Sequence, residues 1–370
     1  MLKQQSKHKM NNSTGCNQFK SIGRLLVVLV ALVFFGITYL NSPATAATNS
    51  DKNSYLVSLV PPSKTTPIFD PGKVYLGITP TGWSNGDDPS IDLYPRIPYQ
   101  QILSEIALSG FKGSQTSGKY PEDIGVLKRE LKLRNLTISE PWVGTEFTVG
   151  KTDETWAEFK KQVQFMQQIG GSKSIVVAEL GNAVHQQPVA PLPNRPKFTD
   201  EQWNALTQGL NQLGKKAKEQ GMQISYHPHI GTGVENLADI DRLMANTNPE
   251  YVNLLLDTGH LYYAGVDPLE VTRKYADRIK HVHLKNIRQP ILDESIKKGW
   301  SFLGSIKKGV FTVPGDTKEG AIEFEPILNE LANANYQGWL IVEAEQDPNK
   351  TNPLKNALIA RSYLRDVTGL

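Results

Sequence analysis

Residues 254–268 read LLLDTGHLYYAGVDP, a short apolar run that ends in Asp257 and leads through a glycine to His260. A short apolar run that is bounded by turn-forming residues is typical of a fully buried β-strand. In α/β proteins the polar residues that follow such strands gather at one end of the sheet and form the ligand site. This unit recurs along the chain, and its recurrence decides the fold that we predict.

Short apolar runs alternate with amphipathic stretches from Val74 to the C-terminus. Eight runs are predicted strands: Val74–Ile78, Phe111–Ser114, Leu136–Ser139, Ser174–Ala178, Gln223–Tyr226, Val252–Leu256, His281–Leu284 and Leu340–Val342. The clearest predicted helices are Trp156–Ile169, Asp200–Gln220, Asn236–Met244 and Ile322–Ala334. Strand and helix repeated eight times predict an α/β protein with a parallel sheet closed into a (β/α)₈ TIM barrel. An open doubly wound sheet is disfavoured, because no glycine-rich phosphate turn follows the first strand.

The N-terminal region differs in composition from the rest of the chain. Residues 1–47 combine scattered basic residues, an apolar run over 25–40 and a small-residue end, ATAA, at 44–47. This pattern predicts a secretory signal peptide or, if it is not cleaved, a membrane anchor. Residues 48–72 are rich in Ser, Thr, Pro and Asn and predict a linker, so that 73–370 is the barrel domain. We therefore expect an exported, periplasmic or extracytoplasmic protein that contacts the membrane only through its N-terminal segment.

Charge and cysteine content exclude some functions. Lys and Arg total 40 against 37 Asp and Glu, and a net charge of +3 over 370 residues does not indicate a nucleic-acid surface. Cys16 is the only cysteine, so neither an intramolecular disulfide nor a cysteine metal site can form. Any metal must be bound by histidines and carboxylates.

Polar residues follow five of the predicted strands. They are Glu179 after the fourth strand, His227 and His229 after the fifth, Asp257 and His260 after the sixth, His283 and Lys285 at the seventh, and Glu343 and Glu345 after the eighth. Each residue alone has an ordinary explanation, because a strand-end His or Asp often satisfies nearby backbone groups. Several carboxylates and imidazoles at one barrel mouth would repel one another and lose solvation, at a cost of several kcal/mol, unless a cation lies between them.

We therefore predict one divalent metal ion at the mouth. Mixed His and carboxylate ligation suits Mn²⁺ or Co²⁺, with Zn²⁺ or Fe²⁺ as alternatives, and it suits Mg²⁺ if water supplies several ligands. The sequence does not choose among these ions.

The words at the strand ends resemble the xylose-isomerase-like barrel superfamily of sugar isomerases, epimerases and related metal enzymes. Within that superfamily the resemblance is greatest to the myo-inosose-2 dehydratases, and it extends over about residues 74–365. The words that carry it are LGITPTGWSN, GSQTSGKYP, SYHPHIGTGV, LLLDTGHLYYAGVDP, IKHVHLKNIR, GVFTVPGD and GWLIVEAEQDP. The resemblance implies a TIM barrel with a metal-dependent activity on a polyhydroxy carbonyl compound.

The resemblance also implies a set of metal ligands. Carried over to this sequence, the family's positions on strands five to eight are His227, Asp257, His283 and Glu343. The strand-five position is often Glu in the sugar epimerases, so Glu179 from strand four remains an alternative to His227.

Dehydration of a cyclic polyhydroxy ketone requires removal of the proton next to the carbonyl group. His260, His229 and Lys285 are the candidate catalytic residues, with His260 favoured as the base. The substrate-binding candidates are Trp83, Asn85, Asp88, Lys119, Trp142, Arg288, Asp316 and Glu345. For Trp83 and Trp142, packing of a loop onto the barrel is an equally good explanation, and Lys119 is also consistent with a solvated residue at a helix start.

Three functions remain open from the sequence. The first is a metal-dependent dehydratase of inosose-like ketones, acting on a small polyol or sugar. The second is a sugar isomerase or epimerase, because reprotonation of the same enolate gives that reaction. Gln115, where the family's dehydratases often have Glu, and the export segment both favour it over the first. The third is an exported sugar-binding protein without catalysis. The oligomeric state is open.

Overall fold

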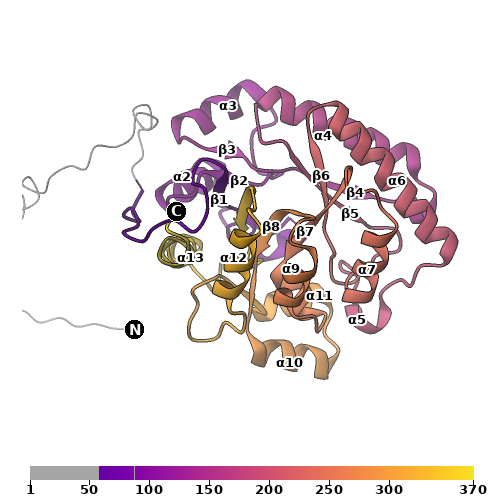
Figure 1. Cartoon of the computed structure of the whole chain (residues 1–370). Helices are drawn as coiled ribbons and strands as arrows, with labels where there is room; N and C mark the ends of the chain where they lie inside the picture. Colours follow the sequence, from indigo (N-terminus) through magenta and orange to yellow (C-terminus); the bar gives the residue numbers. More distant parts are fainter. Residues whose placement is uncertain (1–57, 87) are drawn as a thin grey trace, which may run out of the picture. The chain divides into compact units, whose positions relative to one another are not determined.

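The computed structural model of the chain describes residues 58–86 and 88–370. The strands of the main sheet are parallel and lie in the order β3-β2-β1-β11-β8-β7-β6-β5-β4 (Figure 1). Their bounds are β1 Val74–Ile78, β2 Gly113–Ser114, β3 Thr137–Ile138, β4 Trp142–Thr145, β5 Ser174–Glu179, β6 Gln223–Tyr226, β7 Val252–Asp257, β8 Ile279–Leu284 and β11 Gly338–Val342. Strand follows strand in sequence order around the sheet, as in a TIM barrel.

The two ends of the sheet belong to one stretch of chain. β3 pairs with β2, whereas β4 pairs with β5, and only Ser139, Glu140 and Pro141 separate β3 from β4. The third predicted strand, Leu136–Ser139, is therefore extended and interrupted at Glu140. Because this one stretch contacts both β2 and β5, the sheet curls back on itself.

Helices follow the strands on the outside of the sheet (Figure 1). They are α2 Tyr99–Leu108, α3 Ile124–Leu133, α4 Thr152–Ile169, α5 Pro191–Asn194, α6 Asp200–Glu219, α7 Leu237–Ala245, α8 Thr258–Tyr263, α9 Pro268–Tyr275, α12 Phe324–Asn333 and α13 Pro353–Thr368. Side-chain caps fix several starts: the capping boxes Thr199/Gln202 and Asn236/Asp239 begin α6 and α7. The four helices predicted from the sequence are confirmed, with shifts of a few residues at some ends.

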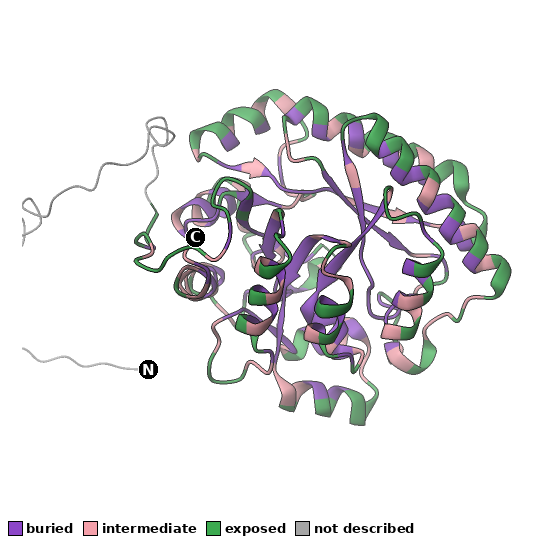
Figure 2. Cartoon of the chain, viewed as in Figure 1, coloured by how far each residue is buried: buried purple, intermediate pink, exposed green. Residues whose placement is uncertain are grey.

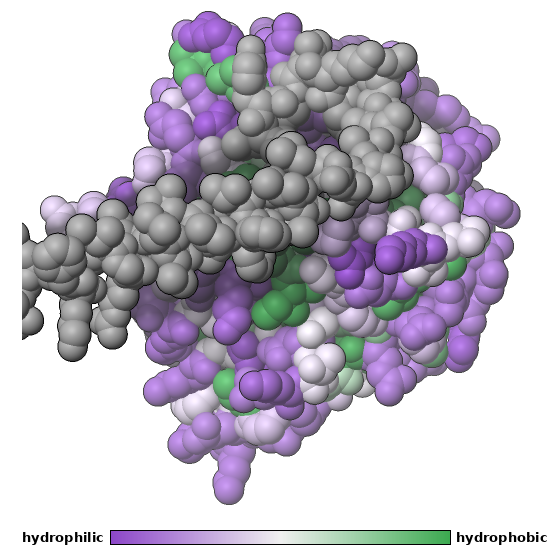
Figure 3. Space-filling view, turned by 90° about the vertical axis from the view of Figure 1, so that its left-hand side faces the viewer, coloured by the Kyte–Doolittle hydropathy of each residue, from purple (hydrophilic) through white to green (hydrophobic). Residues whose placement is uncertain are grey.

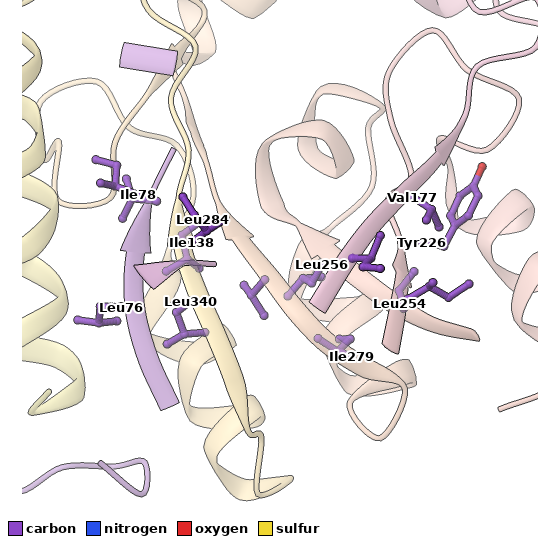
Figure 4. Close-up of a cluster of buried hydrophobic side chains, with 14 of the residues drawn as sticks. Leu76, Ile78, Ile138, Val177, Tyr226, Leu254, Leu256, Ile279, Leu284 and Leu340 are labelled. Carbon is purple, nitrogen blue, oxygen red and sulfur yellow. The ribbon is translucent and has the colours of Figure 1, made fainter. Parts of the chain in front are cut away.

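Alternate residues of each strand face different environments. Leu254 and Leu256 of β7 and Leu284 of β8 belong to the hydrophobic cluster between sheet and helices (Figure 4). Their neighbours Asp257 and His283 lie on the other side, inside the barrel, because side chains alternate along a strand. Figure 2 shows that the strands are mostly buried and that the surrounding helices expose the faces that point away from the sheet. The part of the described surface that is visible in Figure 3 is mostly hydrophilic. The strand period therefore brings polar side chains to the barrel interior.

An insertion between β8 and β11 has no counterpart in the sequence prediction. It consists of β9 Asn286–Ile287, α10 Gln289–Lys298, α11 Phe302–Lys308 and β10 Phe311–Thr312, and β9 and β10 form a two-stranded antiparallel sheet. Its buried side chains form a second hydrophobic cluster, which includes Phe302, Phe311 and Tyr263 of α8. The insertion therefore packs on the end of the barrel where β7 leads into α8.

Residues 58–72 differ from the predicted linker. Val60 and Phe69 are buried, and backbone hydrogen bonds join Leu59 N to Leu108 O and Ile68 N to Thr368 O. This stretch packs against the barrel, because its two apolar side chains remove surface from water there. The predicted export segment, 1–47, and the first part of the linker lie outside the described residues. Within the described residues, none of the helices has the length and apolar character that a membrane span requires.

Gly214 gives a test of how closely α6 packs on the barrel. A Cβ atom at this position would lie 2.1 Å from the backbone oxygen of Tyr251, which precedes β7. We expect Gly214→Ala to lower the free energy of unfolding by about 1–3 kcal/mol, because helix and strand must separate to admit the methyl group. Gln208→Ala, at an exposed position of the same helix, should change it by less than about 0.5 kcal/mol. Urea unfolding measures both, and equal stabilities would contradict this packing.

Candidate metal centre

Four side chains from neighbouring strands converge inside the barrel. His227 follows β6, Asp257 ends β7, His283 lies near the end of β8, and Glu343 follows β11. One ligand atom from each residue lies within 4.8 Å of the other three. The strand register brings these residues together, because Asp257 on β7 is paired with His283 on β8. His283 is in turn paired with Ile341 on β11, two residues before Glu343.

The separations between these atoms are those of hydrogen-bonded and ion-paired groups. Asp257 Oδ2 lies 3.2 Å from His227 Nε2 and 3.6 Å from His283 Nδ1. Glu343 Oε2 lies 2.9 Å from the same His283 nitrogen. The first three residues are 1% exposed and Glu343 is 8% exposed. Two imidazole nitrogens and two carboxylate oxygens in a buried cluster fit a divalent first-row metal ion.

The two oxygens of Asp257 have different roles. Oδ1 accepts a hydrogen bond from the backbone nitrogen of His260 at 2.9 Å and so caps α8. Oδ2 faces His227 and His283. The short link DTGH therefore fixes the carboxylate through the helix start and leaves one oxygen for the cluster.

The cluster stabilises the charged forms of its members. Burial alone would raise the pKa of Asp257, but Lys285, His260 and the hydrogen bonds from His227 and His283 hold that pKa well below its usual value. Burial likewise opposes ionisation of Glu343, whose pKa is lowered by Lys285 and His283. The pKa of His283 is well above its usual value despite burial, because Glu343 and Asp257 attract its proton. The position of His283 Nδ1 therefore favours a cation.

Lys285 is a second hub of the site. Its fully buried ammonium group lies 2.9 Å from Glu345 Oε2, 2.9 Å from His260 Nε2 and 3.1 Å from Glu343 Oε2. Burial lowers its pKa, but Asp257, Glu343 and Glu345 together raise the pKa above the ordinary lysine value. Lys285 is therefore a hydrogen-bond donor in this network, and its raised pKa disfavours the predicted role of general base.

Gly259 makes room for Lys285. A Cβ atom at Gly259 would lie 2.5 Å from Cγ of Lys285. The glycine of the DTGH word therefore allows the lysine side chain to pass close to the start of α8.

His229 and His260 form an imidazole pair beside the cluster, with ring centroids 3.8 Å apart. Burial and the neighbouring His and Lys groups hold the pKa of both well below the usual histidine value, so both rings are neutral. Phe302 of the insertion packs on both rings, and Trp142 of β4 contacts His229 edge-on. These contacts give the pair an aromatic wall.

Glu179, the alternative fourth ligand, is bound elsewhere. Its carboxylate accepts hydrogen bonds from the hydroxyl groups of Thr145 and Thr148, both at 2.7 Å, and from the backbone nitrogens of Phe147, Thr148 and Gly181. It is absent from the groups of potential metal ligands among the described residues. The fourth member of the cluster is His227, and this geometry favours His227 over Glu179 as a ligand because the Glu179 carboxylate fixes the loop after β4.

Several predicted substrate residues have structural partners. Of the two explanations for Trp83, the structure agrees with packing onto the barrel, because this residue is 1% exposed, lies in the hydrophobic core and donates its indole N–H to Glu105. Lys119 forms an ion pair with Asp92 at 2.9 Å. The same Asp92 accepts a hydrogen bond from the backbone nitrogen of Asn85, which is itself buried. A polar network therefore joins the loops after β1 and β2.

The remaining candidates at the rim hold the insertion. Asp88 forms an ion pair with Lys307 of α11 at 2.7 Å. Arg288 donates to the backbone oxygens of Gly309 and Phe311 and pairs with Asp316 at 3.4 Å. Asp316 also lines a cavity of about 590 Å³ whose lining includes none of the four clustered residues. Of the eight substrate candidates, Trp142 and Glu345 are the ones whose contacts place them beside the cluster, through His229 and Lys285.

Two further residues escaped the sequence analysis. Glu140 and His281 are both fully buried and form a second group with His283. Glu140 follows the third predicted strand, so the rule that found the other strand-end carboxylates also applies to it. His281 is two residues before His283 and shares its face of the strand.

Comparison with known proteins agrees with this geometry. The family model described as xylose isomerase-like TIM barrel matches residues 103–367. The chain belongs to the xylose isomerase-like TIM barrel family. A protein of Bacillus cereus named inosose dehydratase 1 is 47% identical over 304 residues, which are 82% of this chain and 100% of that protein. An inosose dehydratase of Clostridium tetani is 46% identical over 81% of this chain and 99% of its own length.

Solved structures of the family share the fold at low sequence identity. An IolI protein described with a zinc atom has a TM-score of 0.58 and 17% identity, and the match covers 80% of this chain and 98% of that one. AsbF of Bacillus anthracis, a probable 3-DHS dehydratase, has a TM-score of 0.57 and 14% identity over 79% of this chain and 98% of its own. These similarities confirm the barrel predicted from the sequence.

The fourth ligand can be tested by paired substitutions. We expect His227→Ala to weaken Zn²⁺ or Mn²⁺ binding by more than about a hundredfold, because even residues that only support a ligand contribute about tenfold to a hundredfold. Glu179→Gln is the control, because it changes a buried side chain of the same volume that lies outside the cluster. This variant should bind the ion with the affinity of the unmodified protein. Chelator competition measures both affinities, and the opposite order would remove His227 from the ligand set.

Proposed function

We propose that this protein removes water from an inosose, a cyclic polyhydroxy ketone, with one divalent metal ion held by His227, Asp257, His283 and Glu343. The observation that carries the proposal is 46–47% identity to inosose dehydratases over their full length or nearly so. The buried cluster of two imidazoles and two carboxylates supports it. We favour Mn²⁺ or Co²⁺, and Zn²⁺, Fe²⁺ and Mg²⁺ are alternatives.

A bound divalent ion would polarise the ketone oxygen and stabilise the enolate that forms when the adjacent proton is removed. The protein must then supply a base for that proton and an acid for the departing hydroxyl group. The carbon–hydrogen bond breaks first, its electron pair enters the enolate, and the carbon–oxygen bond breaks as the hydroxyl group takes a proton and leaves as water. The two tasks need groups in opposite protonation states.

His229 is the base that the geometry favours, in place of His260. Its Nδ1 lies 2.9 Å from the backbone oxygen of Ile230, to which only a protonated nitrogen can donate, so the lone pair is on Nε2. His260 Nε2 instead accepts from the ammonium group of Lys285. His229 is also more exposed than His260, 7% against 2%. Its lowered pKa keeps the ring neutral near pH 7 and able to accept a proton.

Lys285 is the acid in this scheme. Its pKa, raised by three carboxylates, keeps it charged, and its contact with Glu343 places the ammonium group beside a proposed ligand. Glu345 and His260 hold its other protons in place. Trp142, which contacts His227 and His229 edge-on, is the residue that we propose for contact with the apolar face of the ring.

An epimerase or isomerase is the second candidate. A ribulose epimerase has the same fold, with a TM-score of 0.56 at 18% identity, and an enolate can be reprotonated instead of losing a hydroxyl group. The Lys285 ammonium group favours dehydration, because that reaction needs an acid at the leaving oxygen. A sugar-binding protein without turnover is the remaining alternative.

The first functional test is a product assay. We expect purified protein with Mn²⁺ and 2-keto-myo-inositol to form the dehydrated dione, detected by NMR, and EDTA to abolish the reaction. His229→Ala should lower kcat by about 10²–10⁴-fold with unchanged metal content, because general-base catalysis contributes about that much. Gln208→Ala on α6 is the control with full activity. Exchange of the α-hydrogen without dione would indicate an epimerase, and ligand binding without turnover would indicate a binding protein.

We also propose that residues 1–47 export the protein, on the basis of their basic start, apolar run and small-residue end. Expressed from the full sequence in a bacterial host, the protein should appear in the periplasmic or membrane fraction. A variant that starts after residue 47 should stay in the cytoplasm. Equal cytoplasmic recovery of both forms would contradict export.

A further inference from the structure

Glu140 lies on the side of His283 that faces away from the metal ligands. Its Oε1 is 3.5 Å from His283 Nε2, and its Oε2 is 3.6 Å from His281 Nε2. The three residues are at most 1% exposed, and these four atoms have no hydrogen-bond partner among the described residues. A movement of about 0.5 Å would bring both pairs to hydrogen-bond distance.

The surrounding backbone holds this carboxylate in place. Glu140 lies in the interruption between β3 and β4, where its own backbone oxygen accepts a hydrogen bond from the backbone nitrogen of Thr116 at 3.0 Å. On the far side, His281 Nδ1 lies 3.1 Å from the hydroxyl group of Ser174 on β5. A chain of contacts therefore runs from Ser174 through His281 and Glu140 to His283.

Burial determines where the protons of this chain belong. A buried carboxylate is strongly destabilised unless it accepts hydrogen bonds. The donors that face Glu140 are the Nε2 atoms of His281 and His283, so each must carry its proton on Nε2. A neutral His283 with its proton on Nε2 presents the lone pair of Nδ1 to Asp257 and Glu343, which are acceptors as well.

We propose that Glu140 is a positioning residue, which accepts a hydrogen bond from His283 Nε2 and so directs the Nδ1 lone pair of His283 to the metal ion. The inference rests on the proposed function, because it concerns the same ion. In the neutral form of His283 with its proton on Nε2, three acceptors converge, at Asp257, Glu343 and His283 Nδ1, and a metal ion satisfies all three. A carboxylate behind a ligating imidazole fixes its tautomer and increases its basicity.

The alternative hypothesis for Glu140 is that it binds a second metal ion together with His281 and His283. The group offers one carboxylate and two imidazole nitrogens, and no fourth His, Cys, Asp or Glu of the described chain belongs to it. All three side chains are buried, so water does not readily complete the coordination. Positioning is therefore favoured, and the number of bound ions tests it.

The direct test measures the tautomer in the unmodified protein. In ¹⁵N-histidine-labelled protein loaded with Zn²⁺, long-range ¹H–¹⁵N spectra should show that one histidine binds the ion through Nδ1 and carries its proton on Nε2. Ligation of His283 through Nε2 would overturn the inference. Two Zn²⁺ ions per chain, of which Glu140→Gln loses one, would also overturn it and assign a second metal site.

Substitution of Glu140 tests how much this residue contributes to the affinity of the site for a metal ion. We expect Glu140→Gln to weaken Co²⁺ and Zn²⁺ binding by about tenfold to a hundredfold and to shift the visible spectrum of bound Co²⁺. Glu179→Gln, at another buried glutamate, is the control with unchanged affinity and spectrum. His281→Gln, which leaves Glu140 facing His283, should have a smaller effect than Glu140→Gln. Unchanged affinity and spectrum in a folded Glu140→Gln protein would overturn the inference.

The results also separate the inference from the proposed function. Protein that binds Zn²⁺ through His283 Nδ1 but forms no dione from 2-keto-myo-inositol would overturn the function alone. Dione formation together with a Glu140→Gln protein of unchanged affinity would overturn the positioning role alone. Protein that binds no divalent ion would overturn both.

Discussion

The site depends on the concentration of negative charge around Lys285. Asp257, Glu343 and Glu345 are buried, and their oxygens lie 2.9–3.6 Å from the one ammonium group. When His283 is neutral, three carboxylates around one ammonium group leave two negative charges uncompensated in a region from which water is largely excluded, which is unfavourable by several kcal/mol. A divalent ion brings this group to neutrality. The fit of this group to a divalent ion follows from burial and charge, and does not require knowledge of the substrate.

The barrel produces this concentration through its strand geometry. Residues at the ends of β6, β7, β8 and β11 meet because parallel strands end at the same edge and alternate side chains point inward. The same alternation places Leu254, Leu256 and Leu284 against the helices. A shift of one residue in register would exchange the two sets, so the hydrophobic packing outside the barrel also fixes the ligands inside it.

The sequence predicts the parts of this structure that depend on local pattern. The hydrophobic pattern of each strand and the polar residues at its end lie within a few consecutive residues. They predict the barrel and the site residues Asp257, His283 and Glu343. Glu140 obeys the same rule at the end of the third predicted strand, but its approach to His281 and His283 is visible only in the structure. The choice between His227 and Glu179 depends on which hydrogen bonds Glu179 makes with Thr145 and Thr148, and the sequence does not show these contacts.

Other features depend on tertiary packing and were not predictable. The strands β9 and β10 have two residues each, which is too short for an alternating hydrophobic pattern. Their antiparallel pairing is a tertiary contact that the sequence does not show. Trp83 follows a strand as a ligand-binding residue would, yet its indole N–H finds Glu105 and its ring fills the core.

The arrangement of His229 and Lys285 beside the cluster links the structure to the proposed reaction type. Every enzyme that acts through a metal-stabilised enolate needs a base, but only elimination also needs an acid at the neighbouring oxygen. His229 is neutral because burial and nearby cations lower its pKa, whereas Lys285 is charged because three carboxylates raise its pKa. These opposite shifts arise within one buried network, in which Lys285 contacts Glu343, one of the proposed ligands. A network with a neutral imidazole and an ammonium group beside the proposed metal ligands has the two kinds of group that elimination of water requires, and this agrees with the proposed dehydratase.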